Sequence, residues 1–228
     1  MDDVTLLIAV PAYGGSIKSP CVMSLLKLQK ALSKRSIKSA FDMTSYAEIT
    51  AVRNLLGTLM LDTKQVTHLL FVDSDMQFKP ESVLKLIEAE KPVIGCLYSE
   101  RQESRGLVGV VDTPTEVPEN GLIEVGALGM GLCLIERSVF EEMAADESVA
   151  RQHPHPFPHR LEGPLIGFFN APEEEAYLSE DIAFCRRYTS ITGRPVHALA
   201  REDIGHVGEA IYRRATDISL IMPKGAQD

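Results

Sequence analysis

The chain has 228 residues, of which 45% are hydrophobic, and carries a formal net charge of -9. This length predicts one domain with a sizeable core, and the negative charge argues against a nucleic-acid partner, whose phosphates would be repelled. The longest apolar runs are far shorter than the roughly 20 residues that span a bilayer. The acidic start Met1-Asp2-Asp3 has no signal-peptide pattern, and four scattered cysteines indicate reduced core thiols. We therefore expect a cytoplasmic protein without a transmembrane segment.

The first half of the chain alternates predicted strands with predicted helices. Strands are expected at 5–10, 36–44, 69–72 and 93–98, and helices from Ser19-Pro20, over about 47–61 and from Pro80. This order predicts a mostly parallel central sheet with helices on both faces, an α/β fold of Rossmann-like type. Ligands of such sheets bind beyond the carboxyl ends of the strands. The loop 11–15, the two carboxylates after residue 72 and the segment 98–105 all fall at that edge.

The second half predicts a small antiparallel addition to this sheet. Short strand-like segments at 107–111, 122–128 and 131–136 are separated by turn residues. Ser138 is expected to cap a short helix, the Pro-rich stretch 146–164 to form a loop, and Ser179 to begin a helix that ends at Gly193. A last strand is predicted at 196–199.

Two carboxylates at the end of a buried strand are the most informative feature. The apolar run Leu69–Val72 leads directly into Asp73-Ser74-Asp75. A carboxylate buried there is costly unless it is paired or holds a metal, and hard oxygen ligands suit Mg²⁺ or Mn²⁺, which keep positions open for substrate phosphates. The alternative is a turn in which Asp73 or Asp75 caps the next helix, since Asp-x-Asp alone is a common triplet.

Several further motifs, in order, resemble those of the GT-A-fold glycosyltransferases, which move a sugar from a nucleotide diphosphate to an acceptor. They are strand-Pro11-Ala12-Tyr13, the helix motif Ala51-Val52-Arg53-Asn54, Phe71-Val72-Asp73-Ser74-Asp75, the Gly-rich segment 126–131, Ser179-Glu180-Asp181 and Gly205-His206-Val207-Gly208. The resemblance covers roughly residues 4–213. It departs from the family in that the chain is short and shows no obvious acceptor-binding domain.

The resemblance implies one GT-A-type catalytic domain over 1–228, with a nucleotide-binding half at about 1–105, a donor-sugar and acceptor half at about 106–216, and a tail at 217–228. It implies a Mn²⁺ or Mg²⁺ ion held by Asp73, Asp75 and His206, and Asp181 or Glu180 as the catalytic base. Donor contacts are expected from Pro11, Ala12, Tyr13, Arg53, Asn54, Asp73, Ser74, Arg101 and Gly129. The partners would be a UDP- or GDP-sugar and a glycan acceptor. Peripheral membrane association and a homodimer are compatible with this assignment.

Each residue also has a plainer interpretation, and both stay open at this stage. His206 could satisfy a turn, Arg53 could be a solvated helical arginine, and Glu180 and Asp181 could only complement the dipole of their helix. Arg101 and Arg105 could be solvated loop charges. The run 153–159, with three histidines between prolines, is expected to be a closing loop rather than a metal cluster. Phe168 and Phe169 could form a sugar platform or pack in the core.

Other activities fit the pattern less well. A haloacid-dehalogenase-type phosphatase also has Asp-x-Asp after a buried strand, but here Met76 follows and no later acidic motif matches. A sugar nucleotidyltransferase needs a basic Gly-rich loop after its first strand, and Pro11–Gly15 contains no basic residue. A nucleotide-sugar-binding module without turnover is the non-enzymatic alternative. The sequence does not decide between an inverting and a retaining mechanism.

Overall fold

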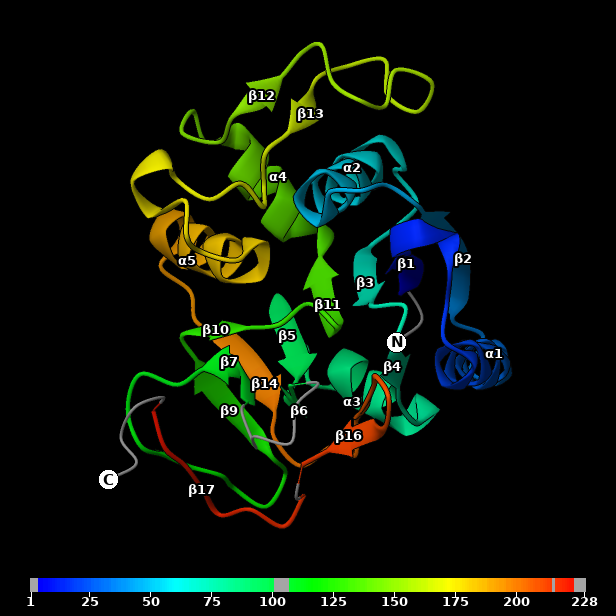
Figure 1. The fold of residues 1–228 in the computed structure, drawn as a ribbon, viewed down its shortest axis with the longest axis vertical. Coiled ribbons are helices and arrows are strands. Elements are labelled where there is room, and N and C mark those ends of the chain that lie inside the picture. Colours follow the sequence, from blue (N-terminus) through cyan, green and yellow to red (C-terminus); the bar gives the residue numbers. More distant parts are fainter. Residues whose placement is uncertain (1–3, 101–106, 215, 224–228) are drawn as a thin grey trace.

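A seven-stranded sheet forms the centre of the protein, for which we use a computed structural model that describes residues 4–100, 107–214 and 216–223 (Figure 1). The strands, in the order in which they pair, are β2 (Lys38–Thr44), β1 (Thr5–Pro11), β3 (His68–Val72), β11 (Leu132–Glu136), β5 (Val93–Cys96), β14 (Val196–Leu199) and β9 (Leu122–Val125). Five run in one direction, and β11 and β9 run in the other. The predicted fold class, a mostly parallel sheet in an α/β protein, is confirmed.

Helices cover both faces of this sheet, so the molecule has three layers (Figure 1). The helices are α1 (Ser19–Lys34), α2 (Ile49–Asp62), α3 (Pro80–Glu88), α4 (Arg137–Ala145) and α5 (Glu180–Thr192). Apolar side chains of α1 and α3 pack on one face, and those of α2, α4 and α5 pack on the other. All four cysteines are buried and free, as the sequence predicts.

Short antiparallel strands extend the fold beyond the central sheet, as predicted for the second half, but the segment 131–136 that was assigned to this addition forms β11 inside the central sheet. Three of them, β10 (Ala127–Leu128), β7 (Leu107–Val110) and β6 (Tyr98–Ser99), form one small sheet. A second sheet joins β16 (Ile211–Arg213), β15 (Gly205–Val207) and β4 (Met76–Gln77). The pairs β12 (Arg151–Gln152) with β13 (Leu165–Ile166), and β17 (Leu220–Ile221) with β8 (Thr115–Glu116), complete the strands.

Some local predictions were wrong, among them that 146–164 is a loop throughout, since β12 lies within it. Ser138 lies inside α4, whose N-cap is Glu136, because the helix begins directly where β11 ends. The strand at 196–199 is not the last one, since β15, β16 and β17 follow it. Strands of two or three residues are too short to show an alternating pattern, so their pairing partners decide them. Ser179 does precede α5 at the N-cap position, although its hydroxyl bonds to Asp181 and not to a backbone amide of the helix. Gly193 ends the helix in the left-handed conformation with φ 68°.

Helix α2 is buried on every side rather than on one face. Residues 51–58 are all buried, including the polar Arg53 and Asn54. The segment after β12 covers its outer side: the Thr58 hydroxyl accepts the Ile166 amide, and the Asn54 side chain accepts the Phe169 amide at 2.8 Å. Phe169 stacks on Phe184 with ring centroids 4.5 Å apart, and Phe168 is fully buried. These two phenylalanines are therefore core residues and not a surface platform for a sugar.

Candidate active site

The loop that carries Asp73 and Asp75 is held from both sides at the carboxyl end of β3. The Asp73 amide donates to the Gly131 carbonyl at 3.0 Å, and the Asp75 carbonyl accepts the Val207 amide at 2.8 Å. The Ser74 carbonyl accepts the Lys18 amide at 2.8 Å, just before α1. Segments from four parts of the sequence thus converge where a parallel sheet places its ligands. Asp75 is 5% exposed, whereas Asp73 and Ser74 are half-buried.

Arg53 crosses from α2 to this loop and is 97% removed from solvent. Its Nη2 donates to Asp73 Oδ1 at 2.9 Å, and its Nε donates to Glu180 Oε1 at 3.0 Å. Burial alone would lower the pKa of this guanidinium, but the carboxylates of Asp73 and Glu180 outweigh burial and raise it. Arg53 is therefore always charged, and it is not the solvated helical arginine that the sequence also allowed.

His206, on β15, faces Asp75 although the two are far apart in the sequence. Its Nε2 lies 3.7 Å from Asp75 Oδ1, and its Nδ1 lies 2.9 Å from the Ser99 carbonyl oxygen. A carbonyl can only accept, so Nδ1 carries the proton, and in the neutral ring the lone pair is on Nε2, on the side of Asp75. This is the orientation in which a histidine ligates a metal while its other nitrogen is fixed by the protein.

Tyr98 packs beneath this histidine and explains the nearby glycines. Its ring meets the His206 ring edge to face at 5.4 Å, and its hydroxyl accepts the Gly131 amide at 3.1 Å. A Cβ at Gly129 would lie 2.4 Å from the Tyr98 hydroxyl oxygen, and one at Gly131 would lie 2.6 Å from it. Burial, and more weakly Asp73, raises the pKa of Tyr98 well above its usual value, so it stays a neutral phenol. Sequence reasoning missed Tyr98 because an aromatic residue at the end of a strand is an ordinary core pattern.

The acidic pair at the start of α5 is divided between two roles. Glu180 is ion-paired with Arg53. Asp181 Oδ1 accepts bonds from the Ser179 hydroxyl and from the Ile182 amide. Within the described part of the chain, both of these bonds fall on Oδ1, which leaves Oδ2 to accept a proton from another molecule.

The other expected donor contacts are scattered around this centre. Pro11 and Ala12 are buried at the end of β1, whereas Tyr13 is 76% exposed on the short helical turn Tyr13–Gly15. Asn54 is used within the protein, where its amide nitrogen donates to Asn170 at 2.7 Å. Arg101 and Arg105 lie outside the described residues. Cys21 also contacts this centre, although the sequence did not single it out. Its thiol donates a hydrogen bond to the Asp73 carbonyl, and burial raises the pKa of that thiol to about 12.

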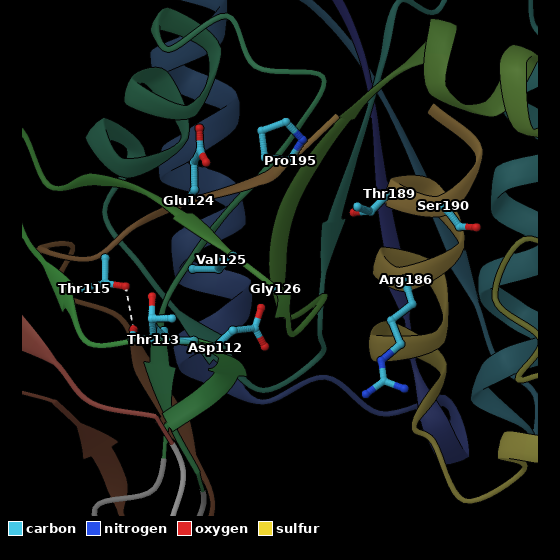
Figure 2. Close-up of a pocket in the computed structure, with 11 residues that line it drawn as sticks. Asp112, Thr113, Thr115, Glu124, Val125, Gly126, Arg186, Thr189, Ser190 and Pro195 are labelled. Carbon is cyan, nitrogen blue, oxygen red and sulfur yellow. Dashed lines mark hydrogen bonds between the residues drawn. The ribbon is translucent and has the colours of Figure 1, made fainter. Parts of the chain in front are cut away.

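The histidine-rich run 153–159 and the main cavity described below do not belong to this centre. Among the residues that the structure describes, no group of three or more His, Cys, Asp or Glu could hold a metal ion, which includes the run 153–159. A cavity of about 540 Å³ lies between the second half of α5 and the end of β9 (Figure 2). Asp112, Glu124 and Arg186 line it, and none of the predicted site residues does. No described helix is both long and apolar enough to cross a membrane.

Comparison with known proteins supports the fold. No family model and no curated protein matches the sequence. Among solved structures, the protein A197 from STIV matches with a TM-score of 0.58 and 18% identity over 97% of this chain and 95% of that one. At this identity the match shows a shared fold and nothing about activity.

Two glycosyltransferase structures match less well. One, involved in the glycosylation of the major capsid of PBCV-1, has a TM-score of 0.36 and 9% identity over 60% of this chain and 62% of its own. The other is the catalytic domain of Drosophila beta1,4galactosyltransferase 7 in complex with xylobiose, with a TM-score of 0.44 and 10% identity over 95% and 69%. Matches with TM-scores of 0.36 and 0.44 do not indicate the function of this protein.

Proposed function

We propose that this protein is a metal-dependent glycosyltransferase that moves a sugar from a nucleotide-diphosphate sugar to a hydroxyl of a glycan. The observation that carries the proposal is the meeting of Asp75 and His206 at the carboxyl end of β3, with a separation of 3.7 Å between Oδ1 and Nε2. Beside them lies the half-buried Asp73, ion-paired with Arg53, and the first turn of α5 brings Asp181 into the same region. The order of sequence motifs adds independent support.

The residues present fit a divalent cation. A carboxylate oxygen and an imidazole nitrogen 3.7 Å apart can both contact one ion at about 2.1 Å. The Ser99 carbonyl fixes the histidine tautomer that ligation requires. Two protein ligands leave most positions of a Mn²⁺ or Mg²⁺ ion for water and substrate phosphates, which is how such ions are used at phosphate sites. When bound, the cation stabilises negative charge on the leaving diphosphate as a Lewis acid.

The protein's own groups would then perform the remaining tasks. Asp75 and His206 would hold the cation, and Arg53 orients Asp73 through their 2.9 Å ion pair. Asp181 Oδ2 takes the proton from the acceptor hydroxyl as that oxygen attacks the anomeric carbon. Glu180 is less suited to this task, because its carboxylate is already ion-paired with Arg53 at 3.0 Å.

A thermal-shift and calorimetry screen tests the proposal. UDP and GDP, and then their sugar conjugates, are titrated with Mn²⁺, with Mg²⁺ and with EDTA. We expect stabilisation by a nucleoside diphosphate only when the metal is present, because a ligand that binds only the native state raises the free energy of unfolding by RT ln(1 + [L]/Kd). A response confined to free phosphate would instead indicate a phosphatase, and metal-dependent binding without transfer or hydrolysis would indicate a binding module.

His206→Ala is expected to weaken metal-dependent binding of the nucleoside diphosphate by about 10- to 100-fold, since one of two protein ligands is lost. Calorimetry on the folded fraction gives the affinity, and thermal denaturation gives the stability. His197→Ala is the matched control, because His197 lies on β14 away from this centre. If the His206 variant loses only stability and keeps its affinity, the histidine serves the turn and not the metal.

A further inference from the structure

Arg53 links two parts of the site that the sequence separates widely. One edge of its guanidinium, formed by Nε and Nη2, contacts Glu180 at the start of α5 and Asp73 in the loop after β3. Its third nitrogen, Nη1, is buried and has no hydrogen-bond partner among the described residues. The guanidinium carbon lies over the Phe71 ring, 5.2 Å from the centroid. Protein atoms therefore surround this side chain on every side.

Such a buried charge is expensive to keep, so its partners matter. Removing an ion from water carries a penalty that only good pairing offsets, and loss of one partner leaves the others uncompensated. Because Nε and Nη2 lie on the same edge of a rigid planar group, the two carboxylates that they bind are held side by side. Without Arg53, Asp73 and Glu180 would repel each other, and the loop after β3 and the first turn of α5 would move apart.

We propose that Arg53 is a positioning residue that sets the distance between the Asp73–Asp75 loop and the first turn of α5, which carries Asp181. Arg53 does not contact the donor in this arrangement, contrary to the expectation from sequence, because a phosphate would have to displace a carboxylate from a side chain that is 3% exposed. The inference rests on the proposed function, which requires a fixed distance between the metal ligand Asp75 and the base Asp181. A shift of about 1 Å between reacting groups can cost on the order of 100-fold in rate.

Arg53→Lys tests this role because it keeps the positive charge but removes the planar pair of donors, Nε and Nη2, that binds the two carboxylates. A lysine ammonium is a single point charge on a flexible stem and cannot fix two carboxylates in one plane. We expect kcat for slow hydrolysis of the sugar donor to fall by about 10- to 100-fold, while KM for the donor stays within about threefold. Glu180→Gln, which keeps the side-chain shape, should likewise lower kcat and leave the donor KM nearly unchanged. It provides a second variant if Arg53→Lys folds poorly.

Arg137→Lys is the matched control. Arg137 is also a largely buried arginine, but its Nε donates to the Val66 carbonyl and its Nη2 to the Met60 carbonyl, both at 2.6 Å, at the opposite end of β3. This variant should lose stability while kcat per folded molecule stays unchanged. A fall in Arg53→Lys activity that only matches its loss of folded protein, as in the control, would overturn the positioning role.

Amide hydrogen exchange gives a readout that does not depend on turnover. In Arg53→Lys and Glu180→Gln, the first amides of α5, such as Ala183, should exchange at least about tenfold faster relative to amides in the middle of α1, because the anchor of that helix end is weakened. In Arg137→Lys this ratio should not change. If wild-type protein shows no metal-dependent donor binding, the proposed function fails while the exchange result still tests the link. Unchanged exchange in both site variants, or a raised donor KM with kcat intact, overturns the inference.

Discussion

Replacing Asp75 by asparagine is expected to abolish Mn²⁺-dependent binding of nucleoside diphosphates, with a loss of affinity of at least about 100-fold, or ~2.7 kcal/mol. Asp75 is the buried carboxylate that faces His206, and its exposed fraction is 5%. An amide has the same shape but no negative charge, so a divalent cation loses one of its two protein ligands and the charge that holds it. Isothermal titration with UDP or GDP, with and without Mn²⁺, measures the effect.

Asp112→Asn is the control for this substitution. It removes the same charge from an exposed carboxylate at the rim of the cavity in Figure 2, away from the site. Its nucleotide affinity should equal that of the wild type, which would exclude an effect of net charge alone. Thermal denaturation of both variants shows whether the fold is intact. An Asp75→Asn protein that is folded and binds with unchanged affinity would rule out Asp75 as a metal ligand.

Asp181→Asn is expected to bind the donor normally and to transfer sugar at least about 100-fold more slowly, because a general base typically contributes 10²–10⁴-fold, roughly 3–5 kcal/mol of barrier. If Asp181 only complements the dipole of α5, the same change costs at most ~1 kcal/mol of stability and leaves turnover nearly unchanged. The hydrogen bond from the Ser179 hydroxyl can survive on the amide oxygen, which keeps the local structure comparable. Donor hydrolysis by water is the first assay, followed by transfer to candidate glycans.

The control for Asp181 is Glu174→Gln, which removes a charge from the exposed turn Glu173–Glu175 that precedes α5. Its rate and its donor affinity should both match those of the wild type. Transfer by Asp181→Asn within a few-fold of the wild-type rate would exclude this residue as the base. Glu180 or a retaining mechanism would then have to be considered.

Much of the fold could be predicted from the sequence because hydrophobic periodicity is a local property. The buried runs that became β1, β3, β5 and β14 are continuous and apolar, and the helices between them carry a clear inner face. The start of α5 at Ser179 and its end at Gly193 were likewise predicted correctly from residue type alone. The carboxylates after β3 were recognised as candidates because a carboxylate buried at the end of such a strand is costly unless it is paired or holds a metal.

The tertiary structure alone decided which of these side chains meet. The strand order places β11 between β3 and β5, so the Gly-rich segment before β11 reaches the Asp73 loop. The segment after β12 covers the outer side of α2, so Arg53, which the sequence also allowed as a solvated helical arginine, is buried between Asp73 and Glu180. The pairing of β15 with β4 brings His206 to Asp75, and the burial of Phe168 removes it from any surface. Such contacts depend on the packing of distant segments, and no local pattern of residues encodes the distance between them.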